Sequence, residues 1–224
     1  MNKQEILLFE MPLFTKVQTK TPSTEPIDLP SDACFAYILK GDNQMFSTEE
    51  NIVASKGKVI LSLCGFTLGQ MLSGLSQGYL HVIVTHFNYG LLQKVFEGNK
   101  PELWEEIATP VTQFVVQKSA NNLIESYFNN IEQLFSNEEA LNENLLKLKL
   151  QEIINLLLQT EKSESIRKIV NSLFSERKFS FKELVDAHID KTDSVENLAM
   201  LTSTSVSSFK RKFKEIYRTT PARY

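Results

Sequence analysis

The sequence predicts an α+β protein, with an antiparallel β barrel or sandwich in its first 100 residues and an all-α second half. Two observations support this fold class. Before residue 100, short runs rich in Val, Ile, Phe and Tyr lie between turn-forming clusters of Gly, Asn, Asp and Ser. After Gly98 no glycine occurs, and apolar residues recur at helical spacing. With 224 residues, 42% of them hydrophobic, the chain is long enough to bury a sizeable core.

Three runs in the first half read as strands: CFAYILK (34–40), KVILSLCGF (58–66) and YLHVIVTHF (79–87). The segment TKTPSTEPIDLPSD (19–32) contains three prolines and is predicted to be a loop. The segment NYGLLQKVFEG (88–98) predicts one short helix that ends at Gly98. The strands come at the intervals of an antiparallel sheet.

Alternate residues of these runs are expected to face the inside of the β domain. There they line either a filled core or an apolar ligand pocket, and the residues leave both possibilities open. A pocket for a small or fatty ligand would need at least ~300 Å³. The predicted inward-facing set is Phe35, Tyr37, Leu61, Leu63, Tyr79, His81 and Ile83.

Two long helices are predicted after the β half. Residues 116–135 have apolar side chains at 3.6-residue spacing, and residues 136–160 begin with Ser136 and Glu139 in a capping-box pattern. The second helix has a stripe with steps of 4, 3 and 4, the spacing of a coiled-coil seam. We expect this stripe to join two copies in a homodimer, with a core helix of a monomeric bundle as the alternative. The stripe is Leu146, Leu150, Ile153 and Leu157.

Neither a metal site nor catalysis is predicted. The chain has three histidines, and His81 and His86 lie five apart on a strand, so they point to opposite faces. His188 is remote from both in sequence, and no HxH, GxSxG, P-loop or GxGxxG pattern occurs. The sequence therefore predicts a protein that is not an enzyme and needs no cofactor.

The chain is expected to be cytoplasmic. Its two cysteines, Cys34 and Cys64, are expected to be reduced thiols, although a fold that brought them together could pair them. No apolar run reaches the length of a membrane span, and the first residues lack the basic-then-apolar order of a secretory signal.

The last residues form a basic segment at the end of an acidic chain. Residues 206–224 contain six Lys or Arg and one Glu, a net charge of +5, which leaves −8 for residues 1–205 of a chain whose total is −3. A short helix is predicted in SVENLAMLT (194–202), followed by a turn at 203–205 and a longer helix from Val206. A local basic segment of this kind is typical of contact with a polyanion.

The two sides of the longer helix differ in character. Ser205 is expected to cap its first turn, and Ser180 and Ser194 to cap the helices before it, with Glu183 completing a capping box. The inner stripe is expected to be Val206, Phe209, Phe213, Ile216 and Tyr217. The outer stripe is expected to be Ser207, Lys210, Arg211 and Lys214, whose hydroxyl, ammonium and guanidinium groups can reach bases and phosphates in a major groove.

The segment LAMLTSTSVSSFKRKFKEIYRTTPARY resembles the first helix-turn-helix of the AraC/XylS family of bacterial transcription regulators. The matching features are Leu198-Ala199, Ser205, Phe209, the run Arg211 to Lys214, and the run Thr220 to Tyr224. The chain departs from the family at two places where a glycine is usual, Ser203 and Arg218, and each is expected to need a positive φ.

The resemblance implies a transcription regulator with three regions: a cupin-like β regulatory domain (1–100), a helical linker and dimerisation segment (101–175), and a first helix-turn-helix (176–224). It implies that Ser207, Lys210 and Arg211 read bases while Ser205 and Lys214 hold phosphates. A small molecule or a protein is expected as effector of the β domain.

The family has a second helix-turn-helix after the Pro-x-x-Tyr motif, and this sequence stops at Tyr224. We therefore expect a truncated form of a longer regulator that binds double-stranded DNA weakly. The alternative function is a β-barrel small-molecule sensor or protein-docking module that does not bind DNA.

Overall fold

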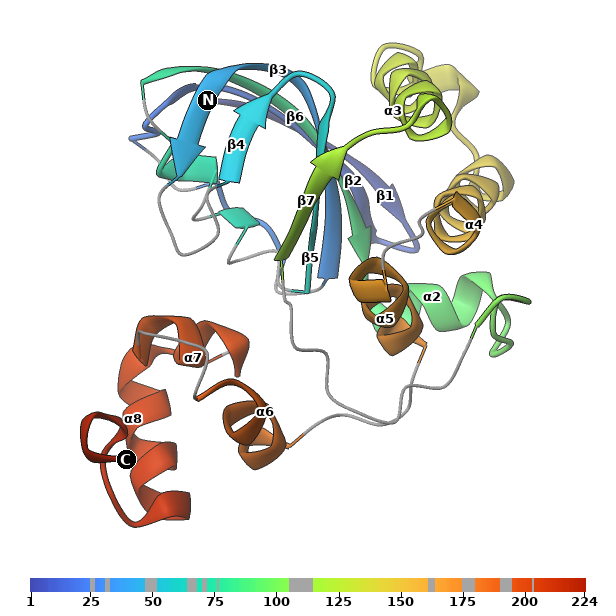
Figure 1. The fold of residues 1–224 in the computed structure, drawn as a ribbon. Coiled ribbons are helices and arrows are strands. Elements are labelled where there is room, and N and C mark those ends of the chain that lie inside the picture. The colour runs from blue at the N-terminus through green and yellow to red at the C-terminus, as the bar shows by residue number, and fades with distance from the viewer. Residues whose placement is uncertain are drawn as a thin grey trace.

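A β-rich first part is followed by helices, as the sequence predicts (Figure 1). The computed structural model describes residues 1–24, 27–30, 33–46, 52–63, 68–69, 72–75, 77–104, 115–160, 164–174, 180–189, 195–202 and 204–224. The strands are β1 (Asn2–Leu8), β2 (Met11–Thr21), β3 (Ala33–Phe46), β4 (Ile52–Ser55), β5 (Lys58–Ser62), β6 (Gly78–Phe87) and β7 (Val115–Ser119). The helices are α2 (Tyr89–Val95), α3 (Asn122–Leu134), α4 (Glu143–Thr160), α5 (Glu164–Leu173), α6 (Phe181–His188), α7 (Val195–Leu201) and α8 (Val206–Tyr217), with short 3₁₀ turns η1 (Glu138–Ala140) and η2 (Pro221–Arg223). None of the described helices is long and apolar enough to cross a membrane.

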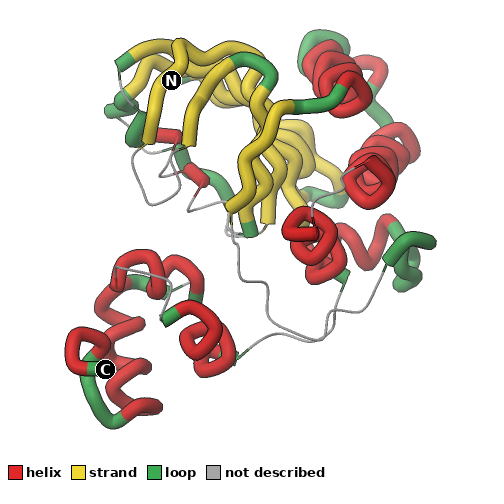
Figure 2. Tube along the Cα trace, viewed as in Figure 1, coloured by secondary structure: helices red, strands yellow, loops and turns green. Residues whose placement is uncertain are grey.

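The strands form one antiparallel sheet in the order β1-β2-β6-β3-β5-β7, and β4 pairs with the C-terminal half of β3. Among the described strands, β1 and β7 each have a partner on one side only, so these pairings do not close the sheet into a barrel. The strands form one curved layer, and the helices α2 to α5 lie along one side of it (Figure 2). The predicted fold class, an antiparallel β part followed by helices, is thus confirmed.

Both faces of the sheet are buried. One face packs against α2 to α5 and carries Phe35, Tyr37 and Ile83. The other face carries Ala36 and Val84, among other small and branched residues. It packs against Ile27, Leu29, Leu68, Leu72 and Leu75. A sheet buried on both sides has apolar residues at consecutive positions, because neither face is solvated.

Four strands lie where the sequence indicated none. We did not predict β1, β2 or β4, and residues 116–119 of β7 were assigned to a helix. In the structure β7 pairs with β5, and α3 begins only after Asn121, whose side chain accepts hydrogen bonds from the N–H groups of Leu123 and Ile124 at 3.0 Å each. A strand at the sheet edge depends on a distant partner, which local spacing does not reveal.

The start of α4 also differs from the prediction. Ser136 and Glu139 do not form a capping box, because the chain passes through η1 before the helix begins. Asn142 caps α4 instead, and its Oδ1 accepts the N–H of Leu145 at 2.9 Å. The short helix α2 agrees with expectation and is followed by Gly98 at φ 74°.

The predicted dimer seam is wrong. Its four leucine and isoleucine residues are at most 5% exposed and belong to the core that α4 shares with the sheet. Two copies could not meet through them without opening that core, so the alternative interpretation, a core helix, describes them correctly. The residues are Leu146, Leu150, Ile153 and Leu157.

The helices α6, α7 and α8 have a core of their own. It consists of Phe181 and Val185 from α6, Leu198 and Ala199 from α7, and the two phenylalanines of α8. Figure 1 shows these three helices grouped together at the C-terminal end of the chain.

Candidate nucleic-acid interface

The group of the three C-terminal helices, α6 to α8, starts with a capped helix, α6. The Ser180 hydroxyl accepts the N–H of Glu183 at 3.2 Å, and the Glu183 carboxylate accepts the N–H of Ser180 at 2.9 Å. This is the capping box that the sequence predicts, and it satisfies two backbone donors at the start of α6.

A four-residue turn joins α7 to α8. The Thr202 hydroxyl donates to the carbonyl of Leu198 at 3.0 Å, and the N–H of Thr204 donates to the carbonyl of Ala199 at 2.9 Å. The Ser205 hydroxyl accepts the N–H of Ser208 at 3.2 Å, so the predicted cap of α8 is confirmed. Thr202 is an additional structural residue that the sequence reasoning missed, whereas Thr204 lies in the predicted turn. Ser194 and Ser203 lie outside the described residues.

The inner side of α8 is aromatic. Phe209 and Phe213 are fully buried, and the Phe209 ring lies 5.2 Å from that of Phe181 on α6, centroid to centroid. Val206 and Tyr217 are half-buried. Ile216 was assigned to this side, but it is 37% exposed, because in the last turn the Tyr217 ring takes the position against Phe213 at 4.3 Å.

The outer side of α8 is polar and cationic. Ser207, Lys210, Arg211 and Lys214 are all exposed, and Ser207 lies 3.1 Å from the hydroxyl of Ser205. Within the described part of the chain, none of the three cationic side chains forms an ion pair. Their positive charge is therefore not neutralised by the protein itself.

The last turn of α8 ends in a left-handed residue. Arg218 has a φ of 58°, and its N–H donates to the carbonyl of Lys214 at 3.0 Å. The sequence predicted a positive φ here because glycine is usual at this position in the resembling family. A non-glycine residue in this conformation costs roughly 1 kcal/mol.

A polar contact joins α8 to α6. The Tyr217 hydroxyl donates to Oδ1 of Asp186 at 2.6 Å, and Lys182 donates to Oδ2 at 2.5 Å. The hydrogen bond from Lys182, and then that from Tyr217, lowers the pKa of Asp186. Burial and the Asp186 carboxylate raise the pKa of Tyr217. The contact between Tyr217 and Asp186 could not be predicted from local sequence patterns, because 31 residues separate the two.

The residues predicted to line a ligand pocket lie on the face of the sheet that packs against the helices. Phe35, Tyr37, Leu61 and Ile83 are buried against the helices, and the Tyr37 ring stacks on Phe128 at 5.1 Å. His81 lies 3.8 Å from Glu132 on α3, and its pKa is lowered mainly by burial. Leu63 and Tyr79 are half-buried. Phe35, Tyr37, Leu61 and Ile83 belong to a filled core, which is one of the two possibilities that the sequence left open, but this core lies between the sheet and the helices.

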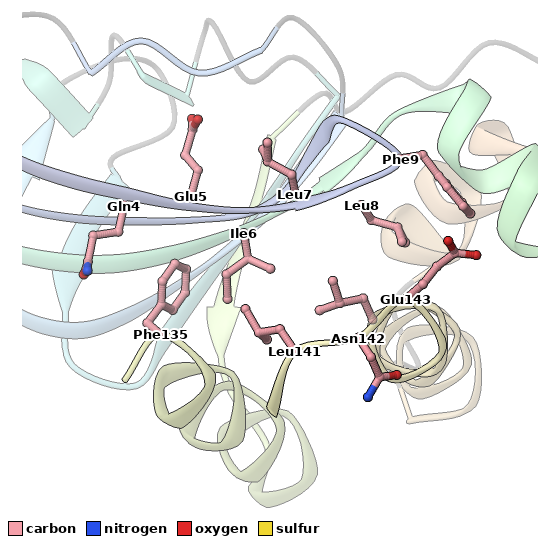
Figure 3. Close-up of a pocket in the computed structure, with 11 residues that line it drawn as sticks. Gln4, Glu5, Ile6, Leu7, Leu8, Phe9, Phe135, Leu141, Asn142 and Glu143 are labelled. Carbon is pink, nitrogen blue, oxygen red and sulfur yellow. The ribbon is translucent and has the colours of Figure 1, made fainter. Parts of the chain in front are cut away.

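A cleft of about 520 Å³ lies instead beside β1, at the junction of α3 and α4 (Figure 3). It is bordered by Gln4, Glu5, Ile6, Leu7, Leu8, Phe9, Phe135, Leu141, Asn142, Glu143 and Leu146. Sequence reasoning missed it because β1 was not predicted and the loop between α3 and α4 was assigned to a helix.

One histidine is buried on the face of the sheet that carries Ala36 and Val84. His86 is 1% exposed, and its Nε2 lies 2.8 Å from the Thr15 hydroxyl, whereas its Nδ1 has no hydrogen-bond partner among the described residues. Burial lowers the pKa of His86 to about 4. In the described residues, no three His, Cys, Asp or Glu side chains converge in a way that could hold a metal ion.

Comparison with known proteins finds a family model that matches more than half of the chain. Residues 33–169 match the family described as the ExsA N-terminal regulatory domain. No curated protein matches the sequence.

Solved structures with a similar course of the chain include ToxT from Vibrio cholerae O395, at 12% identity and a TM-score of 0.41 over 90% of this chain and 74% of that chain. Unsaturated-fatty-acid-bound ToxT from Vibrio cholerae strain SCE256 is also 12% identical, with a TM-score of 0.41 over 95% and 94%. The AraC-like transcriptional activator CuxR is 13% identical, with a TM-score of 0.31 over 91% and 68%.

Proposed function

This chain belongs to the family of ExsA N-terminal regulatory domains, and we propose that it is a transcription regulator that binds duplex DNA through α8. One observation carries this proposal. The helix α8 buries Phe209 and Phe213 in the core with α6 and α7, and it exposes Lys210, Arg211 and Lys214 without ion-pair partners among the described residues. A helix held by its apolar side, with free cations on the other, suits entry into a major groove.

The exposed residues divide into two roles. Arg211 is suited to donate two hydrogen bonds to one guanine, and Lys210 and Ser207 flank it on the same side. Ser205 and Lys214 lie at the two ends of this stripe, and we assign them to phosphates. The regulatory effect on transcription would then follow from occupancy of an operator in the cytoplasm.

We further propose that the regulator works as a homodimer. The seam inside α4 is not available, but the solvent side of the same helix carries Leu148, which is 61% exposed. Leu123 at the start of α3 is 56% exposed. We place the contact with a second copy here because it would remove these two apolar side chains from water, which is favourable.

The test is DNA binding by the whole chain, measured as fluorescence anisotropy of a labelled random duplex from about 50 to 200 mM salt. We expect weak binding that falls steeply with salt. Lys214→Gln should reduce the salt slope by about one, because one phosphate contact is lost.

Lys212→Gln is the matched control. It removes the same charge from the same helix, but Lys212 lies over the Phe181 ring at 5.0 Å and so faces α6. Its slope should stay unchanged. Absence of binding at the lowest salt, or equal effects of the two variants, would refute DNA binding through the outer side of α8.

A further inference from the structure

The cationic side of α8 continues into the residue that ends the helix, Arg218. This arginine follows Arg211 by seven residues and Lys214 by four, which are about two turns and one turn of a helix. Its N–H donates to the carbonyl of Lys214 at 3.0 Å, so its Cα still follows the course of the helix. Arg218 is exposed, and it therefore adds a further cation to the side that carries Arg211 and Lys214.

The backbone of Arg218 has a conformation that glycine adopts more easily. Its φ is 58° and its ψ is 13°, in the left-handed region. In the described part of residues 180–224, no other non-glycine residue has a positive φ. A glycine after the last helical turn reaches this region without the steric contact of a Cβ atom. An arginine here therefore makes the helix end less stable than a glycine would, unless its side chain stabilises the fold by contacts of its own.

The side chain of Arg218 makes no such contacts. It forms no hydrogen bond, ion pair or ring contact with the described residues, and its exposure keeps it out of the core of α6 to α8. A cation near a helix C-terminus favours the helix through its dipole, but Lys214 already occupies the last turn. Strained residues without a structural reason are typical of functional sites.

We propose that Arg218 binds a phosphate of the DNA backbone, a role that rests on the proposed function of α8. Arg211 and Arg218 lie roughly 10 Å apart along the helix axis, at about 1.5 Å per residue. The major groove is about 12 Å wide, so a residue this far from the one at the base edges lies beside a phosphate strand. A guanidinium group can donate two parallel hydrogen bonds to one phosphate. The less stable helix end is then the consequence of a DNA contact that glycine could not make.

The experiment measures DNA binding and thermal unfolding of the whole chain and of its Arg218→Gly variant. Anisotropy of a labelled random duplex from about 50 to 200 mM salt gives the slope of log K against log salt. Arg218→Gly should reduce this slope by about one, because one phosphate contact is lost. The ratio of the wild-type to the variant association constant should shrink about threefold over this range, since a phosphate contact contributes most at low salt. The thermal unfolding midpoint should stay at or above that of the wild type, because glycine relieves the strain.

Two further substitutions at this position separate charge from backbone freedom. Arg218→Asn removes the charge but tolerates the left-handed conformation, so its DNA binding should match that of Arg218→Gly. Arg218→Lys restores the charge and should restore the wild-type slope. Lys212→Gln removes a charge on the side of α8 that faces α6, and it should leave the slope unchanged.

Lys214→Gln distinguishes failure of this proposal from failure of DNA binding itself. If Lys214→Gln lowers the slope and Arg218→Gly does not, α8 binds DNA but Arg218 does not contact it. If neither variant lowers the slope, binding through the outer side of α8 is refuted, and the role of Arg218 with it. A thermal midpoint of Arg218→Gly below that of the wild type would show that the arginine stabilises the fold, and this result would also overturn the proposal.

Discussion

The Tyr217 hydroxyl lies 2.6 Å from Oδ1 of Asp186 and so joins the end of α8 to α6. The other oxygen of that carboxylate accepts from Lys182, one turn earlier on α6. The opposite end of α8 is held by the Ser205 cap and the turn after α7. The helix that we assign to DNA is thus fixed at both ends, by contacts to different helices.

Replacing Tyr217 with Phe should test this contact without disturbing packing. The ring still stacks on Phe213, but the hydrogen bond is lost, and we expect the free energy of unfolding of the C-terminal helices to fall by about 0.5–1.5 kcal/mol. Urea unfolding monitored by circular dichroism would measure it. Tyr224→Phe is the control, since Tyr224 is 62% exposed, and it should change little. Equal losses in both variants would mean that the bond to Asp186 is unimportant.

Truncation of Phe209 to Ala should destabilise the C-terminal helices by about 3–5 kcal/mol. Phe209 is fully buried in a core that α6, α7 and α8 share, and none of the described residues of that core comes from the sheet. We therefore expect amide hydrogen exchange to rise throughout α6 to α8 and to stay unchanged in β2 and β6. Ile216→Ala is the matched control because Ile216 is 37% exposed, and it should cost less than about 1 kcal/mol. Loss of protection in the sheet as well would show that the two parts unfold together.

The features that sequence reasoning predicted correctly are local. The capping box of Ser180 and Glu183, the cap at Ser205 and the spacing of Phe209 and Phe213 all depend on residues within one or two helical turns. Interactions at three or four residues are set by helix geometry alone, so they can be read without the rest of the fold.

The features that were missed depend on distant partners. In the run from Phe35 to Ile38 every residue is apolar and buried, so alternation could not show which side faces the helices. The strand β1 begins with Asn2, Lys3, Gln4 and Glu5. These residues pair with β2, but their polar sequence has no local pattern that indicates a strand. Likewise, the side of α4 that is buried depends on how the helix packs against the sheet, and its own sequence does not show this.

His86 should make the fold sensitive to acid. Its pKa is about 4 in the folded state because of burial, and about 6.5 when unfolded. The unfolded state therefore takes up the proton first, and the stabilising effect of neutral His86, complete above pH 6.5, is lost as the pH falls toward 4. Between pH 7 and 5 the free energy of unfolding should drop by about 2 kcal/mol more in the wild type than in His86→Gln.

His81 provides the comparison for that measurement. Its side chain is 12% exposed, and Glu132 partly offsets the effect of burial on its pKa. His81→Gln should therefore retain most of the acid sensitivity in urea titrations at the two pH values. If His86→Gln were as acid-sensitive as the wild type, the charge state of His86 would not control stability.

Two neighbouring leucines of α4 should behave in opposite ways when changed to Asp. Leu150 is fully buried against the sheet, so Leu150→Asp places an unpaired carboxylate in the core and should unfold the regulatory half. Leu148 is 61% exposed, so Leu148→Asp should keep the fold and its thermal unfolding midpoint.

If the solvent side of α4 joins two copies, sedimentation velocity should show a dimer for the wild type and a monomer for Leu148→Asp, because the interface would have to bury a charge on each copy. Leu103→Asp, at a residue that is 40% exposed and outside α3 and α4, should leave the dimer intact. A Leu148→Asp protein that still forms the wild-type dimer would exclude this side of α4 as the contact.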